Sequence, residues 1–571
     1  MLVQNKTGSL FLLYILLVSQ GLFLPGKAQT PGAQAREELK HHGAVYLVVP
    51  FENRQQLKSL ARYGVIDAVS GDSVRINMKP EQFEEFSGKG WPFRVYTLYR
   101  PTPGKATTLE WQGWNSYPCY TQYDSVMRSF ADSFPAICRL DTIGTTPQNH
   151  QILVVKISDS VHLDQPEPEF LYSAAIHGDE TGCYILMLRL IDYLLSRYGN
   201  DTLVTRLVDN LEILICPLAN PDGTYRGGDE SIAGAWRYNA AGIDLNRNFP
   251  DPQDGDHPDS QEYQPETKAM MDFHQSHHIG FSANFHGGAE VVNYPWDTWS
   301  QYHADDDWFK RVSRIYADTV HQYATAGYMS GFDNGITNGY QWYSISGGRQ
   351  DYVTYFEHGR ESTIELDNDK VTPESLLDTL WEYNYRSLLY YMREAMFGIA
   401  GFVTDSVTGK PVSAEIFIPG HDFDSSQVFS DSASGYYHRY LAAGNYSFSV
   451  RADGYTPKQI SGIVVNNEQQ TRMDVQLVPF SSNKGINNSP QPLIFPNPVR
   501  RGEILKIFNI QFSGHPVLYS VDGKSHELKW SYSEAGRNGF LIPADLPPGV
   551  YILGIHNASS PLYRKIIILE E

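Results

Sequence analysis

Residues 169–180 read EFLYSAAIHGDE, an apolar run of strand length that ends directly in small and polar residues. The run 169–176 has the composition of a strand buried on both faces of a sheet. The segment that follows, 181–198, is apolar nearly all round, which is typical of a buried helix. This stretch therefore predicts a strand and a helix of an α/β domain, with His177 and Glu180 at the turn between them.

The same texture continues on both sides of this stretch. Residues 152–157 and 211–217 are further apolar runs of strand length, and helical patterns separate several such runs. We therefore expect one α/β domain over residues 108–398, with a mixed central sheet covered by helices. Its last helix is predicted over 373–397, with Thr372 as the cap.

Charge and cysteine content narrow the function classes. The chain has 571 residues and a formal net charge of −20, which repels phosphate backbones, so we expect no nucleic-acid partner. Four cysteines are too few for a disulfide framework at this length. Cys119 and Cys138 flank a predicted helix and lie too far apart to bond, whereas Cys183 and Cys216 could pair or remain thiols.

The N-terminal region divides into two parts. Residues 1–28 combine Lys6 with an apolar run and small residues for cleavage, which is typical of a secretory signal peptide. The run is shorter than the roughly 20 residues that span a bilayer, so we expect no transmembrane segment in the mature protein.

Residues 30–100 alternate strand and helix patterns and predict a small α+β module. An inhibitory prosegment, processed at Arg100 or Lys105, and a plain docking domain both remain open.

Beyond residue 398 the pattern changes to short alternating segments broken by Gly, Asp and Pro. Residues 399–479 have the strand spacing of a β-sandwich. A linker over 480–492 separates it from a second all-β region, 493–571. The predicted fold class is multidomain: an α/β domain with a mixed central sheet, preceded by the small α+β module and followed by two β-sandwich domains.

Side chains that bind metals follow two of the apolar runs. His177 and Glu180 are three residues apart at the turn into a helix, and His286 follows a second apolar run before two glycines. Three protein ligands of this kind and a water are the arrangement of a catalytic Zn²⁺ site. Between them, Arg247 beside Asn246 predicts a fork that binds a carboxylate.

Two further acidic features have structural interpretations. Asp244, just before this fork, suits a supporting role in which it holds a zinc-bound imidazole in one tautomer. The acidic run 305–307 precedes a helical pattern over 308–323, and acidic side chains favour the positive start of a helix.

Together these motifs resemble the zinc metallocarboxypeptidases. The similarity consists, in order, of His177-x-x-Glu180, Asn246-Arg247, His286, Tyr343-Ser344-Ile345-Ser346-Gly347-Gly348 and Glu361-Ser362-Thr363-Ile364-Glu365-Leu366. It covers about 290 of the 571 residues. It is strongest to the branch that includes the mammalian carboxypeptidases D, E, M and N, which cut C-terminal Lys or Arg. That branch carries a transthyretin-like β-sandwich directly after the catalytic domain, which the resemblance assigns to residues 399–479.

The resemblance implies roles at the reacting centre. It implies that His177, Glu180 and His286 bind one Zn²⁺. It implies that Glu365 is the general base and that Arg237 polarises the scissile carbonyl.

The resemblance also implies how a peptide end is bound. Asn246, Arg247 and Tyr343 would bind the terminal carboxylate. The pocket for the terminal side chain would be lined by Asn293, Asp297 and Gln350. In the family the Asp of this pocket pairs with Lys or Arg. Asp179 stands between the first two ligands, where the digestive branch has Arg.

The last region resembles the C-terminal sorting domain of the type IX secretion system. The resemblance depends on Phe495-Pro496-Asn497-Pro498, Leu546-Pro547-Pro548-Gly549-Val550-Tyr551 and Lys565-Ile566-Ile567-Ile568. It implies a Gram-negative bacterium, transit through the periplasm, the type IX secretion machinery as a partner, and delivery to the cell surface or medium. An ordinary adhesive or carbohydrate-binding β-sandwich is the alternative.

We therefore expect a secreted, zinc-dependent metallocarboxypeptidase that acts on peptide and protein C-termini and prefers Lys or Arg. Two alternatives remain open. One is a carboxypeptidase of peptidoglycan stem peptides, and the other is a non-catalytic cell-surface binding protein.

Overall fold

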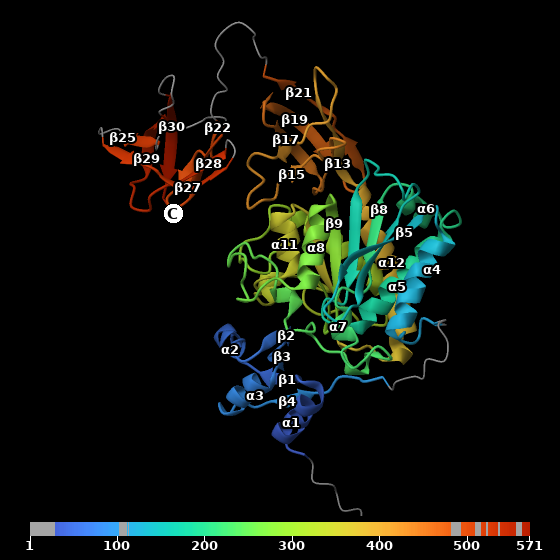
Figure 1. Ribbon diagram of the computed structural model, residues 1–571. Coiled ribbons are helices and arrows are strands. Elements are labelled where there is room, and N and C mark those ends of the chain that lie inside the picture. Colours follow the sequence, from blue (N-terminus) through green and yellow to red (C-terminus); the bar gives the residue numbers. More distant parts are fainter. Residues whose placement is uncertain are drawn as a thin grey trace, which may run out of the picture. The chain divides into compact units, whose positions relative to one another are not determined.

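The computed structural model describes residues 29–101, 111, 113–480, 493–508, 516–520, 524–534, 537–555 and 562–570. The predicted signal peptide, most of the predicted linker 480–492 and Lys105 lie outside these residues. The chain forms two compact units that divide between Pro479 and Phe480. The first contains an N-terminal module, an α/β domain and a β-sandwich, and the second contains a further β-domain (Figure 1).

The N-terminal module is an antiparallel sheet of order β2-β3-β1-β4 with helices α2 and α3 as crossovers, the split βαβ pattern. Its core includes Leu47, Ile76 and Phe83, all fully buried. The sequence pattern does not predict strand β2, because Asp67 interrupts an apolar run there. The elements are α1 Pro31–His42, β1 Val45–Pro50, α2 Arg54–Leu60, β2 Val65–Ser70, β3 Ser73–Met78, α3 Pro80–Ser87 and β4 Arg94–Tyr96.

The α/β domain is built on an eight-stranded sheet of order β11-β10-β12-β9-β7-β8-β6-β5. Strands β8, β7, β9 and β12 are parallel neighbours, and antiparallel pairs flank them, so the prediction of a mixed sheet is confirmed. The strands are β5 Cys138–Thr145, β6 Gln151–Ile157, β7 Glu169–Ala174, β8 Glu212–Cys216, β9 Ile279–His286, β10 Ala289–Tyr294, β11 Ile336–Asn338 and β12 Arg360–Asp367.

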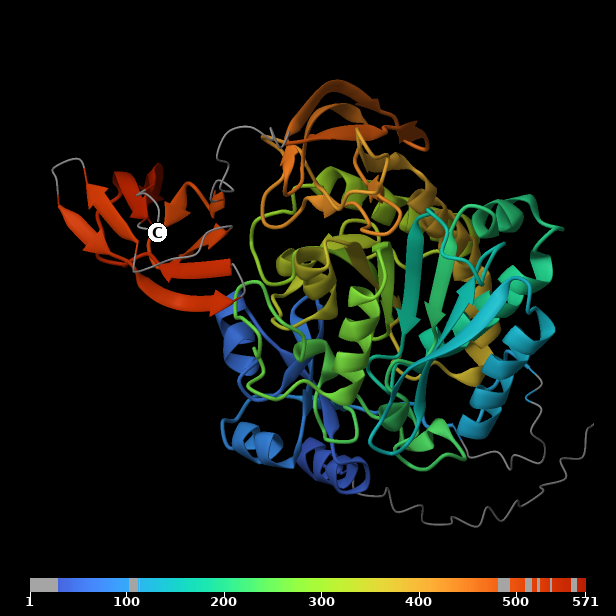
Figure 2. The same ribbon diagram turned by 45° about the horizontal axis from the view of Figure 1, so that its top comes forward.

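Helices cover both faces of this sheet (Figure 1). Helices α4, α5, α9 and α12 share one core cluster, and α8 and α11 belong to a second cluster on the opposite face. Figure 2 shows the same layers from a second direction. The helices are α4 Tyr120–Ser133, α5 Thr181–Arg197, α6 Thr202–Val208, α7 Pro221–Thr224, α8 Pro265–Gln275, α9 Asp306–Tyr323, α10 Gly339–Trp342, α11 Arg349–Phe356 and α12 Leu377–Arg393. Four 3-10 turns, Ile232–Gly234, Leu245–Arg247, Glu374–Leu376 and Glu394–Met396, complete the domain.

Two predictions of local structure need correction or completion. The helix predicted over 373–397 is shorter, because Pro373 has an extended backbone and only a 3-10 turn precedes α12. Thr372 does not cap it, and its hydroxyl donates to Asp367 instead. All four cysteines are buried free thiols, so Cys183 and Cys216 do not pair.

Two short β-sheets follow the α/β domain and pack face to face around a core that includes Ile416, Phe448 and Val475. Their orders are β16-β13-β21-β18, with β20 beside β13, and β15-β14-β17-β19. This is a β-sandwich. The strands are β13 Gly398–Asp405, β14 Glu415–Phe417, β15 Val428–Phe429, β16 Tyr436–Arg439, β17 Gly444–Arg451, β18 Tyr455–Thr456, β19 Lys458–Val465, β20 Gln470–Arg472 and β21 Val475–Pro479.

The second unit is also built of two sheets, of orders β22-β24-β28-β27 and β23-β30-β29-β25-β26. Its core includes Leu505, Phe540 and Ile566. The strands are β22 Leu493–Phe495, β23 Val499–Arg500, β24 Ile504–Phe508, β25 Val517–Ser520, β26 Ser525–Glu527, β27 Lys529–Glu534, β28 Arg537–Leu541, β29 Gly549–Ile555 and β30 Leu562–Leu569. In neither unit does a described helix have the length and apolar character to cross a bilayer.

Candidate active site

Three potential metal ligands lie close together at the carboxyl ends of two central strands of the sheet. Strands β7 and β9 are parallel neighbours, so His177, just after β7, and His286, the last residue of β9, lie at the same end. Glu180, at the start of α5, lies between them. The Nδ1 atom of His177 is 2.7 Å from Glu180 Oε1, and that of His286 is 2.8 Å from Glu180 Oε2. The ligand atoms of all three residues lie within 4.8 Å of one another, and all three are buried.

The second ring nitrogen of each histidine has a polar side-chain partner. His177 Nε2 lies 3.1 Å from Asp244 Oδ1, so this carboxylate fixes the tautomer with the proton on Nε2. His286 Nε2 lies 2.9 Å from Asn284 Nδ2, and rotation of this amide to present Oδ1, which has no hydrogen-bond partner among the described residues, would place the His286 proton on Nε2. Glu180 Oε2 is buried and has no hydrogen-bond partner in the described part of the chain, although His286 Nδ1 lies 2.8 Å from it. Two imidazoles and a carboxylate with an unsatisfied oxygen fit Zn²⁺, which favours N and O ligands.

Glu365 and Arg237 face these ligands. Strands β12 and β9 pair so that Glu365 lies beside His286, and burial, reinforced by the Glu180 carboxylate, raises the pKa of Glu365 well above its usual range. Arg237 donates from Nε to Asp244 Oδ2 at 2.8 Å, so Asp244 joins the arginine to His177. An acid and a guanidinium group therefore lie next to the candidate metal position.

The three residues expected to bind a terminal carboxylate lie together in the same pocket. Asn246, Arg247 and Tyr343 all line it, together with the three ligands, Arg237 and Glu365. Asn246 is fixed because its Oδ1 accepts a hydrogen bond from Arg349 N at 2.9 Å. Arg247 is partly buried, and its Nη1 donates to Asn246 O at 2.7 Å.

The residues expected to contact a terminal side chain lie deeper. Asn293 Nδ2 donates to Asp297 Oδ1 at 3.0 Å, and both residues line the pocket. Burial raises the pKa of Asp297 to about 6. Gln350 is buried and its Oε1 accepts from Thr363 N at 2.8 Å. A Cβ atom at Gly339 would lie 1.7 Å from Asp297 Oδ1, so this wall of the pocket requires glycine.

The structure adds two charged residues that sequence reasoning missed. Asp67, on β2 of the N-terminal module, also lines this pocket. Its Oδ1 accepts from Arg237 Nη1 at 2.9 Å and from Lys370 Nζ at 2.5 Å, and its Oδ2 accepts from Arg75 Nε at 2.5 Å. Burial alone would raise the pKa of Asp67, but Lys370, Arg75 and Arg237 together lower it well below its usual range. Lys370 Nζ also donates to Glu180 Oε1 at 2.6 Å.

The only sequence signal for Asp67 is an acidic side chain within the apolar run 65–69, and Lys370 lies in the polar segment 368–370, which has no distinctive pattern. Asp179, between the first two ligands, is also buried by the module: its Oδ2 accepts from Tyr46 OH at 2.6 Å. Apart from Arg75, the partners named for these residues lie more than a hundred positions away in the chain, which local patterns do not reveal.

A second group of potential ligands, Asp305, His421 and Asp422, does not fit a metal. Both Asp305 oxygens accept from Arg439, at 2.6 and 3.0 Å, and Arg360 Nε donates to Oδ2 at 2.8 Å. Two guanidinium groups therefore already neutralise these carboxylates. The acidic run lies at the start of α9 as predicted, with Asp305 at the N-cap position and Asp306 and Asp307 in the first turn, although the Asp305 side chain forms no capping bond.

Comparison with protein families agrees with this geometry. Residues 123–387 match the zinc carboxypeptidase model, and residues 398–478 match the carboxypeptidase regulatory-like domain. The chain is 31% identical over 410 residues to carboxypeptidase SOL1 of Arabidopsis thaliana, covering 70% of this chain and 79% of that protein. It is 32% identical over 402 residues to the mouse carboxypeptidase N catalytic chain, covering 63% and 86%.

The chain is also 35% identical over 371 residues to human carboxypeptidase D, covering 62% of this chain. It spans only 26% of the length of that relative. Among solved structures, carboxypeptidase A of Helicoverpa armigera has a TM-score of 0.52 at 18% identity, covering 62% of this chain and 98% of that one, which supports the fold. The chain belongs to the zinc carboxypeptidase family, and the predicted enzyme class, metallocarboxypeptidase, is confirmed.

Proposed function

We propose that this protein is a zinc-dependent carboxypeptidase that removes the C-terminal residue, preferably Lys or Arg, from peptides and proteins. The observation that carries the proposal is one pocket lined by the three candidate ligands, Glu365, two arginines and Asp297. Family membership favours this enzyme over a non-catalytic surface-binding protein.

The residues present supply each part of a peptide hydrolysis. His177, Glu180 and His286 would hold a zinc ion, which would supply a Lewis acid and lower the pKa of a water at the site to about 7. Glu365 would take a proton from the attacking water and pass it to the leaving amine, which contributes roughly 10²–10⁴ in rate. Arg237 would donate to the developing oxyanion.

Restriction to chain ends follows from Arg247. A guanidinium group binds a carboxylate through two parallel hydrogen bonds, and Asn246 and Tyr343 lie beside it in the pocket. An internal peptide has no carboxylate at this place and would leave a partly buried charge unpaired, at a cost of about 3–5 kcal/mol.

Preference for a basic terminal residue rests on Asp297. Its carboxylate is buried at the pocket wall, and its side-chain hydrogen-bond partners are the neutral amides of Asn293 and Gln350. A Lys or Arg side chain would supply the missing cation. Gln350 is buried beside this carboxylate and does not itself line the pocket.

The first experiment measures zinc content together with release of C-terminal Arg, Lys and Leu, using enzyme freed of residues 30–107. We expect one zinc per chain and faster release of Arg and Lys than of Leu. Removal of the ion by a chelator should abolish release, and added zinc should restore it. Folded protein that neither retains zinc nor shortens any peptide would contradict the proposal.

The second experiment tests Asp297. We expect Asp297→Ala to lower kcat/KM for peptides that end in Lys or Arg far more than for those that end in Leu. Because the pKa of Asp297 is raised to about 6, the preference for basic ends should be present above this pH and weaken as pH falls through it. Equal losses on both kinds of peptide would exclude the specificity role.

We further propose that the N-terminal module, residues 30–100, is a prosegment that holds the enzyme latent. Asp67 accepts a hydrogen bond from Arg237, the residue assigned to stabilise the oxyanion, so this guanidinium group is not free to bind a substrate. Backbone carbonyls of the same strand contact the groups assigned to the terminal carboxylate: Ile66 O accepts from Arg247 at 3.5 Å and Asp67 O accepts from the Tyr343 hydroxyl at 3.3 Å. The remaining pocket has a volume of about 20 Å³, which admits a water but no amino acid side chain.

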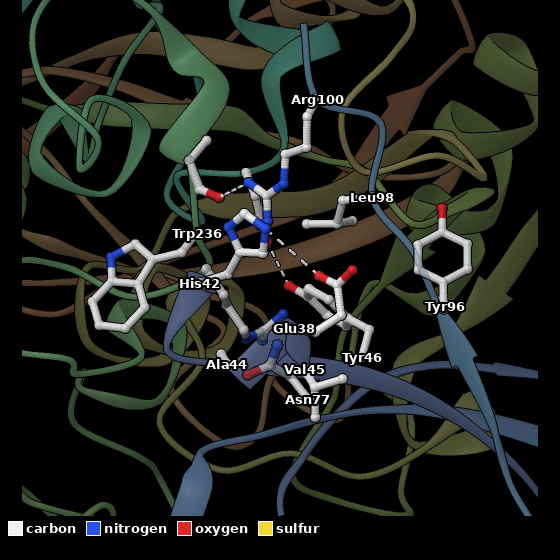
Figure 3. A pocket seen from close by; sticks show the side chains of 13 residues that line it. Glu38, His42, Ala44, Val45, Tyr46, Asn77, Tyr96, Leu98, Arg100 and Trp236 are labelled. Carbon is white, nitrogen blue, oxygen red and sulfur yellow. Dashed lines mark hydrogen bonds and ion pairs between the residues drawn. The ribbon is translucent and has the colours of Figure 1, made fainter. Parts of the chain in front are cut away.

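The contact between the module and the α/β domain leaves little free space elsewhere. A second pocket, lined by His42, Tyr46, Asn77, Arg100 and Trp236, has a volume of only about 10 Å³. Figure 3 shows His42 at its centre, between Arg100 on one side and Tyr46 and Asn77 on the other. Comparing activity before and after removal of residues 30–107 tests latency, and no gain on removal would leave only a docking role.

The predicted secretion signals remain part of the proposal. We propose export by the signal peptide, residues 1–28, and delivery to the cell surface or medium of a Gram-negative bacterium by the type IX machinery. The two-sheet β-fold of the second unit supports a sorting domain over 493–571. Normal secretion of a chain that lacks these residues would reject this assignment.

A peptidoglycan stem-peptide substrate is the alternative for the same site. Both substrates end in a carboxylate that Arg247 could bind. Parallel assays on basic-ended peptides and on muropeptides would separate the two, and faster release from muropeptides would favour the alternative.

A further inference from the structure

A cleft of about 630 Å³ lies between the α/β domain and the first β-sandwich. One wall is formed by the amino ends of the central strands, including Glu169 at the start of β7 and Glu212 at the start of β8. The candidate active site lies at the carboxyl ends of strands β7 and β9. The cleft therefore lies at the opposite end of these strands. Its volume is within the range of about 300–1,000 Å³ that small-molecule sites have.

The cleft is strongly acidic. Six carboxylates line it against two permanent cations, Lys156 and Arg139. Lys156 is already paired with Glu212 at 2.7 Å, and Arg139 with Asp141 at 2.9 Å. The carboxylates are Asp164, Glu167, Glu169, Glu212, Glu357 and Asp431.

Two of these carboxylates have no cation of their own in the described part of the chain. Glu169 accepts a backbone hydrogen bond from His278 at 2.8 Å, and the His278 ring is paired with Asp431 of the sandwich. Glu167 has a buried Oε2 with no hydrogen-bond partner among the described residues. Burial, with Glu212 as the next cause, raises the pKa of Glu169 to about 8, and burial together with Asp159 raises the pKa of Glu167 to about 7.

The cleft also holds an unsatisfied imidazole. His274, in the last turn of α8, is 2% exposed and lines the cleft. Neither of its ring nitrogens has a hydrogen-bond partner in the described part of the chain. A buried polar group without a partner destabilises a fold, so a polar occupant of the cleft that bonds to His274 would stabilise this one.

The β-sandwich supplies aromatic rings to the opposite wall. Tyr436, Tyr440 and Phe429 all line the cleft, and burial, with the Glu167 carboxylate as the next cause, raises the pKa of Tyr436. Aromatic faces attract organic cations, and unpaired carboxylates attract them more strongly. The volume is far larger than a single metal ion needs.

We propose that this cleft is a binding site for a small organic cation that bears guanidinium or ammonium groups and bridges Glu169 and Glu167 to the aromatic wall of the β-sandwich. The site is separate from the proposed catalytic centre and does not depend on its activity. Because the ligand contacts both domains, its binding stabilises their association.

Calorimetric titration of the full chain with agmatine tests the proposal. Agmatine carries a guanidinium and an ammonium group but no carboxylate, so it cannot use Arg247 in the active site. We expect saturable binding at or below millimolar concentrations. Butylurea, of similar length and without charge, should not bind. At pH 7 binding should release protons, because a cation lowers the pKa of carboxyl groups that are partly protonated there.

Variants locate the site. Glu169→Gln should weaken agmatine binding at least tenfold while the fold is kept, because the amide resembles the protonated carboxyl group that burial already favours. Glu382→Gln, an exposed carboxylate on α12, is the matched control and should leave binding unchanged. Asp297→Asn should also leave it unchanged, which separates this site from the terminal side-chain pocket.

Several outcomes would overturn the proposal. They are no binding at millimolar agmatine, equal binding of butylurea, unchanged affinity in Glu169→Gln, or a loss in Asp297→Asn. Tighter binding of calcium chloride that excludes agmatine would replace the organic cation by a metal.

Discussion

The N-terminal module and the first β-sandwich both contact the α/β domain through buried ion networks, but the two networks use different groups. In the first, Asp67 of the module bonds to Arg237 and Lys370 beside the candidate metal ligands. In the second, Arg439 of the sandwich bonds to Asp305, together with Arg360, away from that pocket. The side chains of Asp67, Asp305 and Arg439 are all at most 1% exposed.

Burial therefore does not distinguish a permanent contact from a releasable one. The difference lies in what else the partner groups bind. Arg237 has a second use in the proposed reaction, so a substrate competes with Asp67 for it. Among the described residues, Arg360 and Arg439 bond only to the acids of this network and to nearby carbonyl groups. The first contact can be exchanged, whereas the second is a structural part of the enzyme.

Asp305→Ala should have the largest effect. It leaves Arg360 and Arg439 buried without their main counter-charge, which costs about 3–5 kcal/mol of unfolding free energy. Urea denaturation of the full chain measures it. Glu382→Ala, which breaks an exposed pair with Arg386 on α12, should change the free energy by less than about 1 kcal/mol. A similar small change in both variants would show that the sandwich is not held by this network.

Asp67→Asn should release the module. It weakens two charge-assisted hydrogen bonds to the α/β domain, from Arg237 and Lys370, each worth about 1.5–3 kcal/mol, so we expect kcat/KM of the unprocessed chain to rise at least about tenfold. Asp72→Asn, the same change at an exposed position of the same hairpin, serves as the control. Unchanged activity, with a module that can be removed to give active enzyme, would place the inhibition elsewhere.

Trp342→Phe should have a smaller effect in the same direction. The indole Nε1 donates to Val69 O at 2.9 Å, and this neutral hydrogen bond is worth about 0.5–1.5 kcal/mol. We therefore expect a gain in activity of the unprocessed chain of about 2–10-fold. A gain larger than that of Asp67→Asn would show that the Trp342–Val69 hydrogen bond contributes more to docking of the module than the Asp67 carboxylate does.

Mild acid should have the smallest effect on docking. The three cations lower the pKa of Asp67 well below its usual range, so its contribution to docking is present above the pKa of the free carboxyl, about 3.9, and is lost only at still lower pH. After cleavage within residues 102–110, the module should co-elute with the remaining chain at pH 5 as it does at pH 7. Release at pH 5 would show that another group controls docking.

The sequence predicts those parts of the site in which polar residues directly follow a recognisable buried strand. Short polar segments follow buried strands at His177 and His286, and strand pairing brings them together. The decisive contacts of the two flanking domains are different, because Asp67 and Asp305 bond to residues 170 and 134 positions away. No local periodicity encodes such pairs. An acid between apolar residues breaks the strand pattern around Asp67, and an acid before a helix resembles an ordinary helix start at Asp305.

The contacts of Arg100 determine whether the module undocks before or after the chain is cut at this residue. Its guanidinium donates to Ala233 O at 3.1 Å and to Ala235 O at 2.7 Å, two carbonyl groups just before Arg237. A trypsin-like protease must draw an arginine into its own specificity pocket before it cuts. At Arg100 it would first have to pull the side chain away from the α/β domain, so cutting at this bond follows undocking and does not cause it.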